Sequence, residues 1–131
     1  MKYTEEKKKL ESLSLENRLQ KISKDETKKI LFNYPNVPLD YLLFLNEIGA
    51  GSIKDSTFNL YSNLINFSDL GLENIYELPS NIMLFGDNFS GDFSGFDLTK
   101  KDSVIEFWHD DNHIFYTGKT FDEYIKTIIY S

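Results

Sequence analysis

The sequence of 131 residues contains no cysteine, three prolines and no long apolar run. Without cysteine, the chain forms no disulfide bond, no thiolate zinc site and no cysteine nucleophile. The first residues, Met-Lys-Tyr-Thr-Glu-Glu-Lys-Lys-Lys, lack the apolar region of a signal peptide. No segment approaches the roughly 18 apolar residues of a membrane-spanning helix. These absences predict a cytoplasmic protein without a membrane segment.

Charge is distributed unevenly along a chain whose length fits one domain with its own core. Residues 1–34 contain nine basic and six acidic side chains, a net charge of +3. Residues 35–131 contain five basic and fifteen acidic side chains, a net charge of −10. Such an acidic body repels nucleic acid and attracts basic proteins. The alternative is that the charge only keeps the protein in solution.

The most distinctive segment is residues 82–98, Ile-Met-Leu-Phe-Gly-Asp-Asn-Phe-Ser-Gly-Asp-Phe-Ser-Gly-Phe-Asp-Leu. Its first four residues are apolar and predict a buried strand. Residues 88–91 are typical of a turn, because Asn, Ser and Gly bond their own backbone or tolerate positive φ. In the second strand, alternation places Phe93, Gly95 and Asp97 on one face. The other face takes Ser94, Phe96 and Leu98.

The segment fits none of three ligand-binding loops, namely the EF-hand, the phosphate loop and the dinucleotide-binding loop. An EF-hand loop starting at Asp87 would need oxygen ligands where Phe89 and Gly91 stand. A phosphate loop needs a Gly-Lys-Ser/Thr step, and the glycine spacing also differs from the dinucleotide fingerprint. We therefore favour turn-fixing roles for the aspartates over roles in catalysis.

Helical patterns occur in the first third of the chain. Leu15, Leu19 and Ile22 follow helical spacing after Ser14, a candidate N-cap. A capping box at Ser23-Lys-Asp-Glu then predicts a second helix that runs to about Phe32. Two prolines in residues 33–38 end it.

Two further helices have clear apolar stripes. The first begins near Pro38, ends at the C-cap Gly49 and buries Tyr41, Phe44, Leu45 and Ile48. The last begins at the capping box Thr120-Phe-Asp-Glu. Its apolar side chains recur at helical spacing: Phe121, Tyr124, Ile125, Ile128 and Ile129.

Strands are expected between these helices. Short strands are predicted at residues 52–53 and 58–61, whereas residues 62–77 fit either short helical turns or loops. Residues 104–109 and 114–117 predict a hairpin across Asp-Asp-Asn-His. The hairpin also contains His109 and His113, at a spacing that suits zinc only on a helix, so we expect no metal site. Trp108 fits either a core position or an exposed interface anchor.

Three ordered blocks resemble the SUKH superfamily of Smi and Knr-type proteins and bacterial immunity proteins. They are Val37-Pro-x-Asp-Tyr-x-x-Phe-Leu-x-x-x-Gly-x-Gly51, residues 84–97, and Val104-Ile-Glu-Phe-Trp with Thr120-Phe-Asp-Glu-Tyr. The resemblance implies a SUKH-like domain at residues 23–131, and residues 1–22, which the resemblance does not cover, are predicted to form a helical extension. It implies a single α+β domain with a central, mostly antiparallel twisted sheet, N-terminal helices and a C-terminal helix packed on it. The structural motif residues are Pro38, Tyr41, Phe44, Leu45, Gly49, Gly51, Phe85, Gly86, Gly91 and Gly95.

The resemblance also implies a function. Bacterial members resemble cytoplasmic antidotes that bind and block a cognate toxin, often a nuclease or deaminase. The acidic body of this chain predicts that such a partner is basic. The candidate contact residues are Asp87, Asp92, Asp97, Trp108, Asp110, Asp111 and Tyr116.

Two other functions remain open. Eukaryotic relatives imply a regulatory scaffold, and Asp87, Asp92 and Asp97 with His109 would be the acid and base groups of a small enzyme. The sequence assigns no catalytic residue, no metal, no cofactor and no nucleic-acid or membrane partner. It leaves the oligomeric state undetermined.

Overall fold

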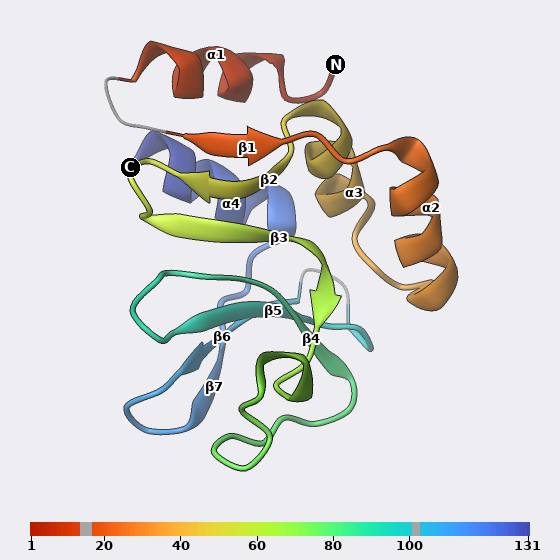
Figure 1. Cartoon of the computed structure of the whole chain (residues 1–131), viewed down its shortest axis with the longest axis vertical. Helices are drawn as coiled ribbons and strands as arrows, with labels where there is room; N and C mark the ends of the chain where they lie inside the picture. Colours follow the sequence, from red (N-terminus) through yellow and green to blue (C-terminus); the bar gives the residue numbers. More distant parts are fainter. Residues whose placement is uncertain (14–16, 101–102) are drawn as a thin grey trace.

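The computed structural model describes residues 1–13, 17–100 and 103–131. Within these ranges the chain forms four α-helices, one 3₁₀ helix and a seven-stranded antiparallel sheet whose strands lie in chain order (Figure 1). The strands are β1 (Arg18–Gln20), β2 (Ala50–Ile53), β3 (Phe58–Ile65), β4 (Ile82–Asp87), β5 (Phe93–Asp97), β6 (Val104–Trp108) and β7 (His113–Tyr116). The helices are α1 (Thr4–Ser12), α2 (Lys24–Asn33), α3 (Leu39–Glu47), η1 (Ser68–Leu70) and α4 (Phe121–Tyr130). The expected α+β class, with N-terminal helices and a C-terminal helix packed on the sheet, is confirmed.

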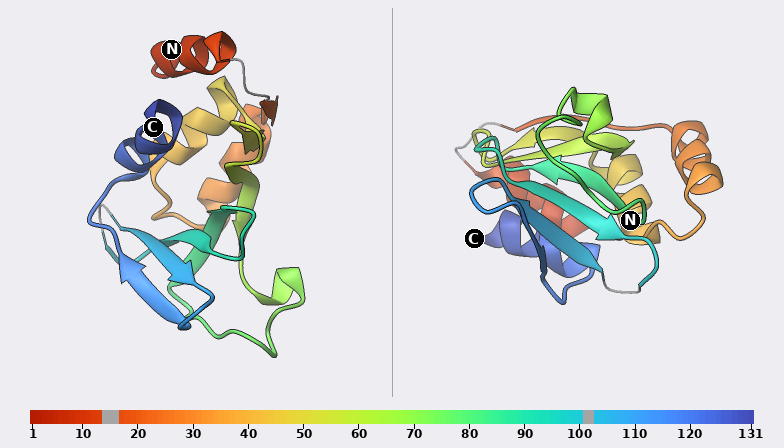
Figure 2. Two further views of the ribbon diagram at one scale, coloured as in Figure 1. Left: turned by 90° about the vertical axis from the view of Figure 1, so that its left-hand side faces the viewer. Right: turned by 90° about the horizontal axis from the view of Figure 1, so that it is seen from below.

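The helices α3 and α4 cover one face of the sheet and bury an aromatic cluster there (Figure 2). Phe85 of β4 lies at its centre, stacked on Phe96 with ring centroids 4.4 Å apart. Tyr41 of α3 and Phe121 of α4 approach the Phe85 ring at 6.0 and 5.5 Å. Aromatic pairs in these geometries contribute beyond the area they bury. This cluster therefore joins both helices to the middle of the sheet.

A bulge in β4 places both Phe85 and Gly86 on the side of the helices. Leu84 pairs with Gly95 and the next paired residue, Gly86, faces Ser94, so Phe85 is the extra residue of the bulge. Leu84 belongs to the opposite face, Phe85 lies on the helix side with Met83, and Gly86 faces Phe58 on that same side. The next residue must be a glycine, because a Cβ at Gly86 would lie 2.5 Å from the ring of Phe58. The glycine thus makes room for the cluster.

The opposite face of the sheet is covered by the connection between β3 and β4. Phe67 and Tyr76 of this connection pack on Phe107, at centroid distances of 5.1 and 5.2 Å. Phe93 joins the same cluster, whereas Phe96 packs on the helix side, so the predicted alternation in β5 is confirmed. The segment that the sequence left open is irregular apart from η1, and β3 extends to Ile65.

The predicted helix from Leu15 to Ile22 is wrong where the structure describes it. Residues 18–20 form strand β1, which pairs with β2, while Ser14 and Leu15 lie outside the described residues. The cause is a long-range contact. A Cβ on Gly51 would lie 2.0 Å from the carbonyl oxygen of Arg18, so the glycine lets β1 lie against β2. Helical spacing alone did not reveal this tertiary contact.

The other helix predictions are confirmed. The Ser23 hydroxyl accepts a hydrogen bond from the Glu26 amide and caps α2. Thr120 and Glu123 form a complete capping box at α4. At the end of α3, the Gly49 amide donates to the carbonyl of Phe44, with Gly49 at a φ of 120°. These local signals fix the helix ends.

Helix α1 packs on the same core as the later helices. The Tyr3 ring is fully buried and meets Phe44 of α3 at 5.0 Å. The Tyr3 amide donates to the Glu47 carboxylate, and Tyr130 of α4 donates to Glu6. The division of the chain at residue 22 stays a prediction. Among the described residues no helix is long and apolar enough to cross a membrane.

Replacing Ile125 with Ala tests the packing of α4. Ile125 is fully buried, so we expect the substitution to lower the free energy of unfolding by about 2–5 kcal/mol. Ile75→Ala, at a side chain that is 63% exposed, is the control and should change it by less than about 0.5 kcal/mol. Urea unfolding followed by circular dichroism measures both. Equal stability of the two variants would remove Ile125 from the core.

A pair of glycine substitutions tests the contact of β1. Gly51 and Gly71 both have positive φ, but only Gly51 has backbone atoms in the space of a Cβ. Gly71→Ala should cost about 1–2 kcal/mol, from its backbone conformation alone. Gly51→Ala should cost more and should speed hydrogen exchange in β1, because the strand must move. If both variants lose the same stability and β1 stays protected, the close approach of β1 does not constrain Gly51.

Candidate functional site

The predicted β6–β7 hairpin is confirmed and forms one edge of the sheet (Figure 1). Its strands pair Glu106 with Phe115 and Trp108 with His113. These four side chains therefore share one face of the hairpin. Most β7 side chains are exposed, as expected for an edge strand.

An exposed aromatic pair lies on this face. The rings of Trp108 and Phe115 stack with centroids 5.1 Å apart and planes 12° apart. Trp108 is 38% exposed and Phe115 is 44% exposed, although both are large apolar groups. The Trp108 indole donates to the Glu106 carboxylate, which also accepts from the Tyr124 hydroxyl of α4. The aromatic pair is thus anchored to the body of the protein.

The sequence predicted Trp108 as a contact residue but missed Phe115. Phe115 lies two residues from His113, the direct partner of Trp108, and so is its diagonal neighbour across the strands. The alternation of side chains along each strand identifies Phe115 as a neighbour of Trp108 only when the register of the hairpin is known. The actual turn lies between Trp108 and His113, one residue earlier than predicted.

The hairpin is tied to the neighbouring turn by Asp92 and His109. The Asp92 carboxylate accepts hydrogen bonds from both the backbone amide and the ring Nδ1 of His109, at 3.1 and 2.8 Å. The ring Nε2 lies 3.0 Å from a carboxylate oxygen of Asp110. Gly91 makes the approach possible, because a Cβ there would lie 3.1 Å from the ring. We call this arrangement the Asp92–His109 clamp.

The clamp changes the pKa of both partners. The hydrogen bond to Asp92 raises the pKa of His109 above its ordinary value, aided by the charges of Asp110 and Asp92. Partial burial would raise the pKa of Asp92, but the hydrogen bonds from His109 outweigh it and lower the pKa. Both shifts favour a charged pair. Since each ring nitrogen faces a carboxylate, His109 is arranged as a bridging cation rather than as a free base.

Asp97 has a buried structural position. Its carboxylate accepts hydrogen bonds from Asn81, from the amide and hydroxyl of Thr99, and from the Tyr116 hydroxyl. Burial would raise the pKa of Asp97, but these bonds outweigh it and hold the pKa well below its usual value. Asp97 thus fixes the turn after β5 and the position of Tyr116, whose ring remains half exposed.

The remaining predicted carboxylates differ in their freedom. Asp87 accepts from the Phe89 amide and from the Tyr61 hydroxyl, so it also fixes a turn. Asp111 accepts from the His113 amide within the hairpin turn. The side chain of Asp110 is 88% exposed and extends beside His109. The structure therefore leaves Asp110 and Asp111 on the surface near Trp108, whereas Asp97 is turned inward.

The positions of the aspartates and of His109 can be compared with what a metal site or an acid–base pair requires. Within residues 1–13, 17–100 and 103–131, no cluster of three His, Asp or Glu side chains could hold a metal ion. Of the proposed acid and base groups, the structure joins only Asp92 and His109 by a hydrogen bond. Asp87 and Asp97 bond to other groups at opposite ends of the β4–β5 pair.

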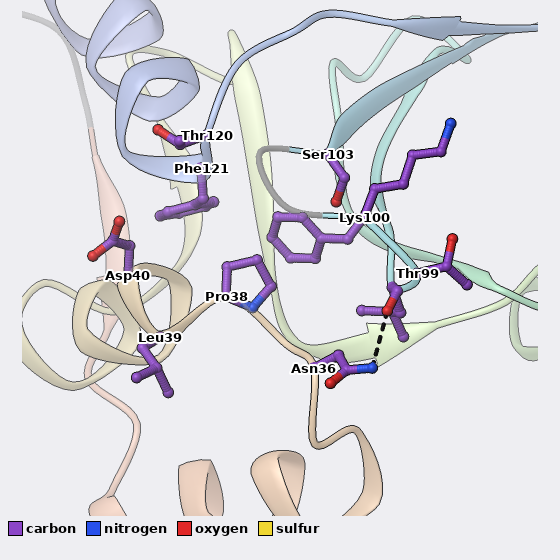
Figure 3. Close-up of a pocket in the computed structure, with 11 residues that line it drawn as sticks. Asn36, Pro38, Leu39, Asp40, Thr99, Lys100, Ser103, Thr120 and Phe121 are labelled. Atoms are coloured by element: carbon purple, nitrogen blue, oxygen red, sulfur yellow. Dashed lines mark hydrogen bonds between the residues drawn. The ribbon is translucent and has the colours of Figure 1, made fainter.

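A pocket of about 580 Å³ lies where α3 and α4 begin (Figure 3). Phe96 and Phe121 give it apolar walls, and Lys100 and Ser103 add polar groups from the β5–β6 connection. Asn36 closes one side through a 3.2 Å hydrogen bond to the carbonyl of Leu98. The Lys100 ammonium also lies 4.8 Å from the centre of the Tyr116 ring, so the pocket adjoins β7.

Comparison with known proteins gives one family. The family model SUKH_6, described as SMI1-KNR4 cell-wall, matches residues 35–125. This range contains α3, all strands from β2 to β7, and the beginning of α4. Neither a curated protein nor a solved structure matches the chain significantly.

The Asp92–His109 clamp predicts a specific pH dependence. Because the folded-state pKa of His109 is raised, its contribution to stability is fully present below about pH 6.5 and is lost as pH rises through the raised pKa. The lowered pKa of Asp92 gives a contribution present above about pH 3.8 and lost as pH falls through the lowered value. We expect His109→Gln to cost more stability at about pH 5.5 than at about pH 8.5.

Urea unfolding at both pH values measures this difference. His113→Gln is the matched control, because it leaves the clamp in place and should preserve the pH dependence of the unmodified protein. Asp92→Asn should also bring the pKa of His109 down toward its ordinary value, as followed by NMR titration of the ring. An equal cost of His109→Gln at both pH values would show that the clamp is not a charged pair.

Proposed function

Because the chain belongs to the SUKH family of SMI1-KNR4 proteins, we propose that it is an immunity protein that binds a toxin protein and blocks it by covering its surface. The observation that carries this proposal is the exposed Trp108–Phe115 stack on a hairpin held by the Asp92–His109 clamp. Aromatic side chains dominate the energetics of protein interfaces, and a rigid element loses little entropy on binding. The binding surface proposed here consists of Glu106, Trp108 and Phe115 on one face of the hairpin, with Asp110 and Asp111 in its turn; Tyr116 lies on the other face.

The charge of this surface indicates the chemistry of the partner. Asp110 and Asp111 lie in the turn of the hairpin that carries the aromatic stack, in a chain whose residues 35–131 carry a net charge of −10. Such a surface complements a basic one, as found on proteins that bind nucleic acid. A nuclease or deaminase toxin fits this requirement. The protein would then act in the cytoplasm, where these toxins meet their substrates.

The proposed action is stoichiometric binding rather than catalysis. The carboxylates that suit an acid or base role are hydrogen-bonded within turns, and both ring nitrogens of His109 face carboxylates. These arrangements support a fixed surface. An aromatic stack with carboxylates around it supplies affinity and rapid association without any reaction.

A regulatory scaffold is the second candidate. The description of the matching family names the cell wall, and the resemblance to eukaryotic Smi and Knr-type proteins implies a regulatory scaffold. The same hairpin surface would serve such a role, with a cellular protein in place of a toxin. The identity of the bound partner distinguishes the two functions.

Loss of the aromatic stack tests the proposed function. The partner to test is the protein encoded by the adjacent gene, produced with and without the protein and assayed for toxicity. We expect Trp108→Ala with Phe115→Ala to weaken toxin binding by about 30-fold or more, since interface anchors contribute at least about 2 kcal/mol. Calorimetry measures affinity and stoichiometry, and cell growth measures protection. The control Ile75→Ala should keep full affinity and full protection.

The carboxylates should affect the association rate more than the affinity. Asp110→Asn with Asp111→Asn keeps an acceptor oxygen at each position, so the turn should be preserved. The variant should slow association and weaken its dependence on salt, while affinity falls only modestly. If the aromatic double variant protects cells as well as the unmodified protein does, the interface lies elsewhere. Binding without protection would favour the scaffold role.

A further inference from the structure

A second surface is formed by the helices α2 and α3. The two helices are joined by residues 34–38 and lie on the side of the molecule away from the β6–β7 hairpin (Figure 1). The Thr27 hydroxyl donates to the Asn46 side chain at 3.2 Å, so the start of α2 meets the end of α3. The two helices are therefore antiparallel neighbours.

One stripe from each helix lines a groove of about 310 Å³ between them. The α2 stripe consists of Lys24, Thr27, Lys28 and Leu31. The α3 stripe consists of Leu39, Leu42, Leu43 and Asn46. Both stripes have the spacing i, i+3, i+4 and i+7, which places their members on one helix face. We call this feature the α2–α3 groove.

The apolar side chains of the groove are exposed. Leu39 is 62% exposed, Leu43 is 39% exposed and Leu31 is 36% exposed. Leu42 is buried beneath them and forms the floor. Helix α3 thus presents leucines on both of its sides, one set to the aromatic cluster and one to the groove. Contiguous exposed apolar groups of this kind mark interaction sites.

The charge along the groove is positive, whereas the net charge of the whole protein is negative. Lys24 and Lys28 stand on the α2 wall, and neither forms an ion pair with another residue that the structure describes. The net charge of the chain is −7, but residues 1–34 carry +3. A partner segment in the groove would meet lysines along one side and leucines along the other.

We propose that the α2–α3 groove binds an amphipathic helix of a partner protein, with apolar residues at helical spacing and carboxylates along the flank that faces Lys24 and Lys28. Two antiparallel helices leave a groove into which a third helix packs by the same ridges and grooves. Apolar side chains at i, i+3, i+4 and i+7 of the incoming helix then meet Leu31, Leu39 and Leu43. A concave groove of this shape favours a helix over a flat lipid surface. This binding is independent of the proposed toxin interface, which lies on the β6–β7 hairpin.

The test uses two designed peptides with the unmodified full chain. Both are two-heptad helices with Leu at positions a and d, stabilised by one crosslink on the outer face and labelled with fluorescein. The first carries Glu at positions e and g, and the second carries Lys there. Fluorescence anisotropy at low salt measures binding. Because the whole protein is acidic, long-range charge alone favours the basic peptide. We expect the acidic peptide to bind about 3–10-fold more tightly, as a few exposed ion pairs allow.

Variants of the chain locate the binding. Leu39→Ser with Leu43→Ser should abolish binding of the acidic peptide. Leu70→Ser is the matched control, because Leu70 is 40% exposed on η1 and should leave binding unchanged. Lys24→Glu with Lys28→Glu should reverse the preference to the basic peptide. Circular dichroism and thermal unfolding check that each variant is folded, which is expected because the substituted side chains are exposed.

Several outcomes would overturn the proposal. Tighter binding of the basic peptide, equal binding of both peptides, or no binding of either one excludes the acidic helix as occupant. Dimerisation in sedimentation equilibrium that Leu39→Ser with Leu43→Ser abolishes would assign the groove to a second copy of the chain. Cosedimentation with phosphatidylcholine and phosphatidylglycerol vesicles that depends on these leucines would assign it to a membrane surface. None of these measurements involves the toxin, so they are separate from the test of the proposed function.

Discussion

The position of Phe85 is the constraint on which the rest of the structure depends. In a regular strand Asp87 would share the face of Met83 and Phe85, toward α3 and α4. The bulge leaves the Phe85 ring on the helix side, where it contacts rings from α3, β3, β5 and α4, and turns Asp87 to the other face, where it bonds Tyr61. Gly86 accompanies the bulge, because any larger residue would displace Phe58. Both helices are therefore positioned against one ring of the central strand.

The aspartates of residues 82–98 stabilise turns, although the same residues were expected to contact a partner. Asp87, Asp92 and Asp97 each accept hydrogen bonds that fix a turn, and the bonds to Asp92 also join two turns through His109. A carboxylate used in this way has less capacity for a partner, because its lone pairs are already occupied. Asp110 carries most of its side chain into solvent, and the stack of Trp108 and Phe115 on the same hairpin is also exposed. The side chains available for recognition are those that the fold does not require.

Local signals explain which parts of the fold the sequence predicts. Helix α4 and the β6–β7 hairpin follow from a capping box, an apolar stripe and two strand patterns around a turn, all of them short-range features. Strand β1 does not, because its conformation depends on pairing with β2 across Gly51. The conformation of the β3–β4 connection cannot be predicted from the sequence for a similar reason. Phe67 and Tyr76 are ordered by packing on Phe107 rather than by a periodic pattern. At the candidate site, Trp108 was found by residue type, whereas Phe115 required the register of the hairpin.

The two proposed surfaces have opposite electrostatic character, and this difference has a physical consequence. A basic partner is attracted to the carboxylates beside Trp108 and repelled by Lys24 and Lys28 in the α2–α3 groove. An acidic helix is repelled by the hairpin and attracted to the groove. Charge therefore separates the two classes of partner even though both surfaces offer exposed apolar groups, since like charges across an interface cost more than neutral contacts gain. A domain of this size thus has room for two chemically distinct interactions, one on helices α2 and α3 and one on the β6–β7 edge of the sheet, with the aromatic cluster around Phe85 between them.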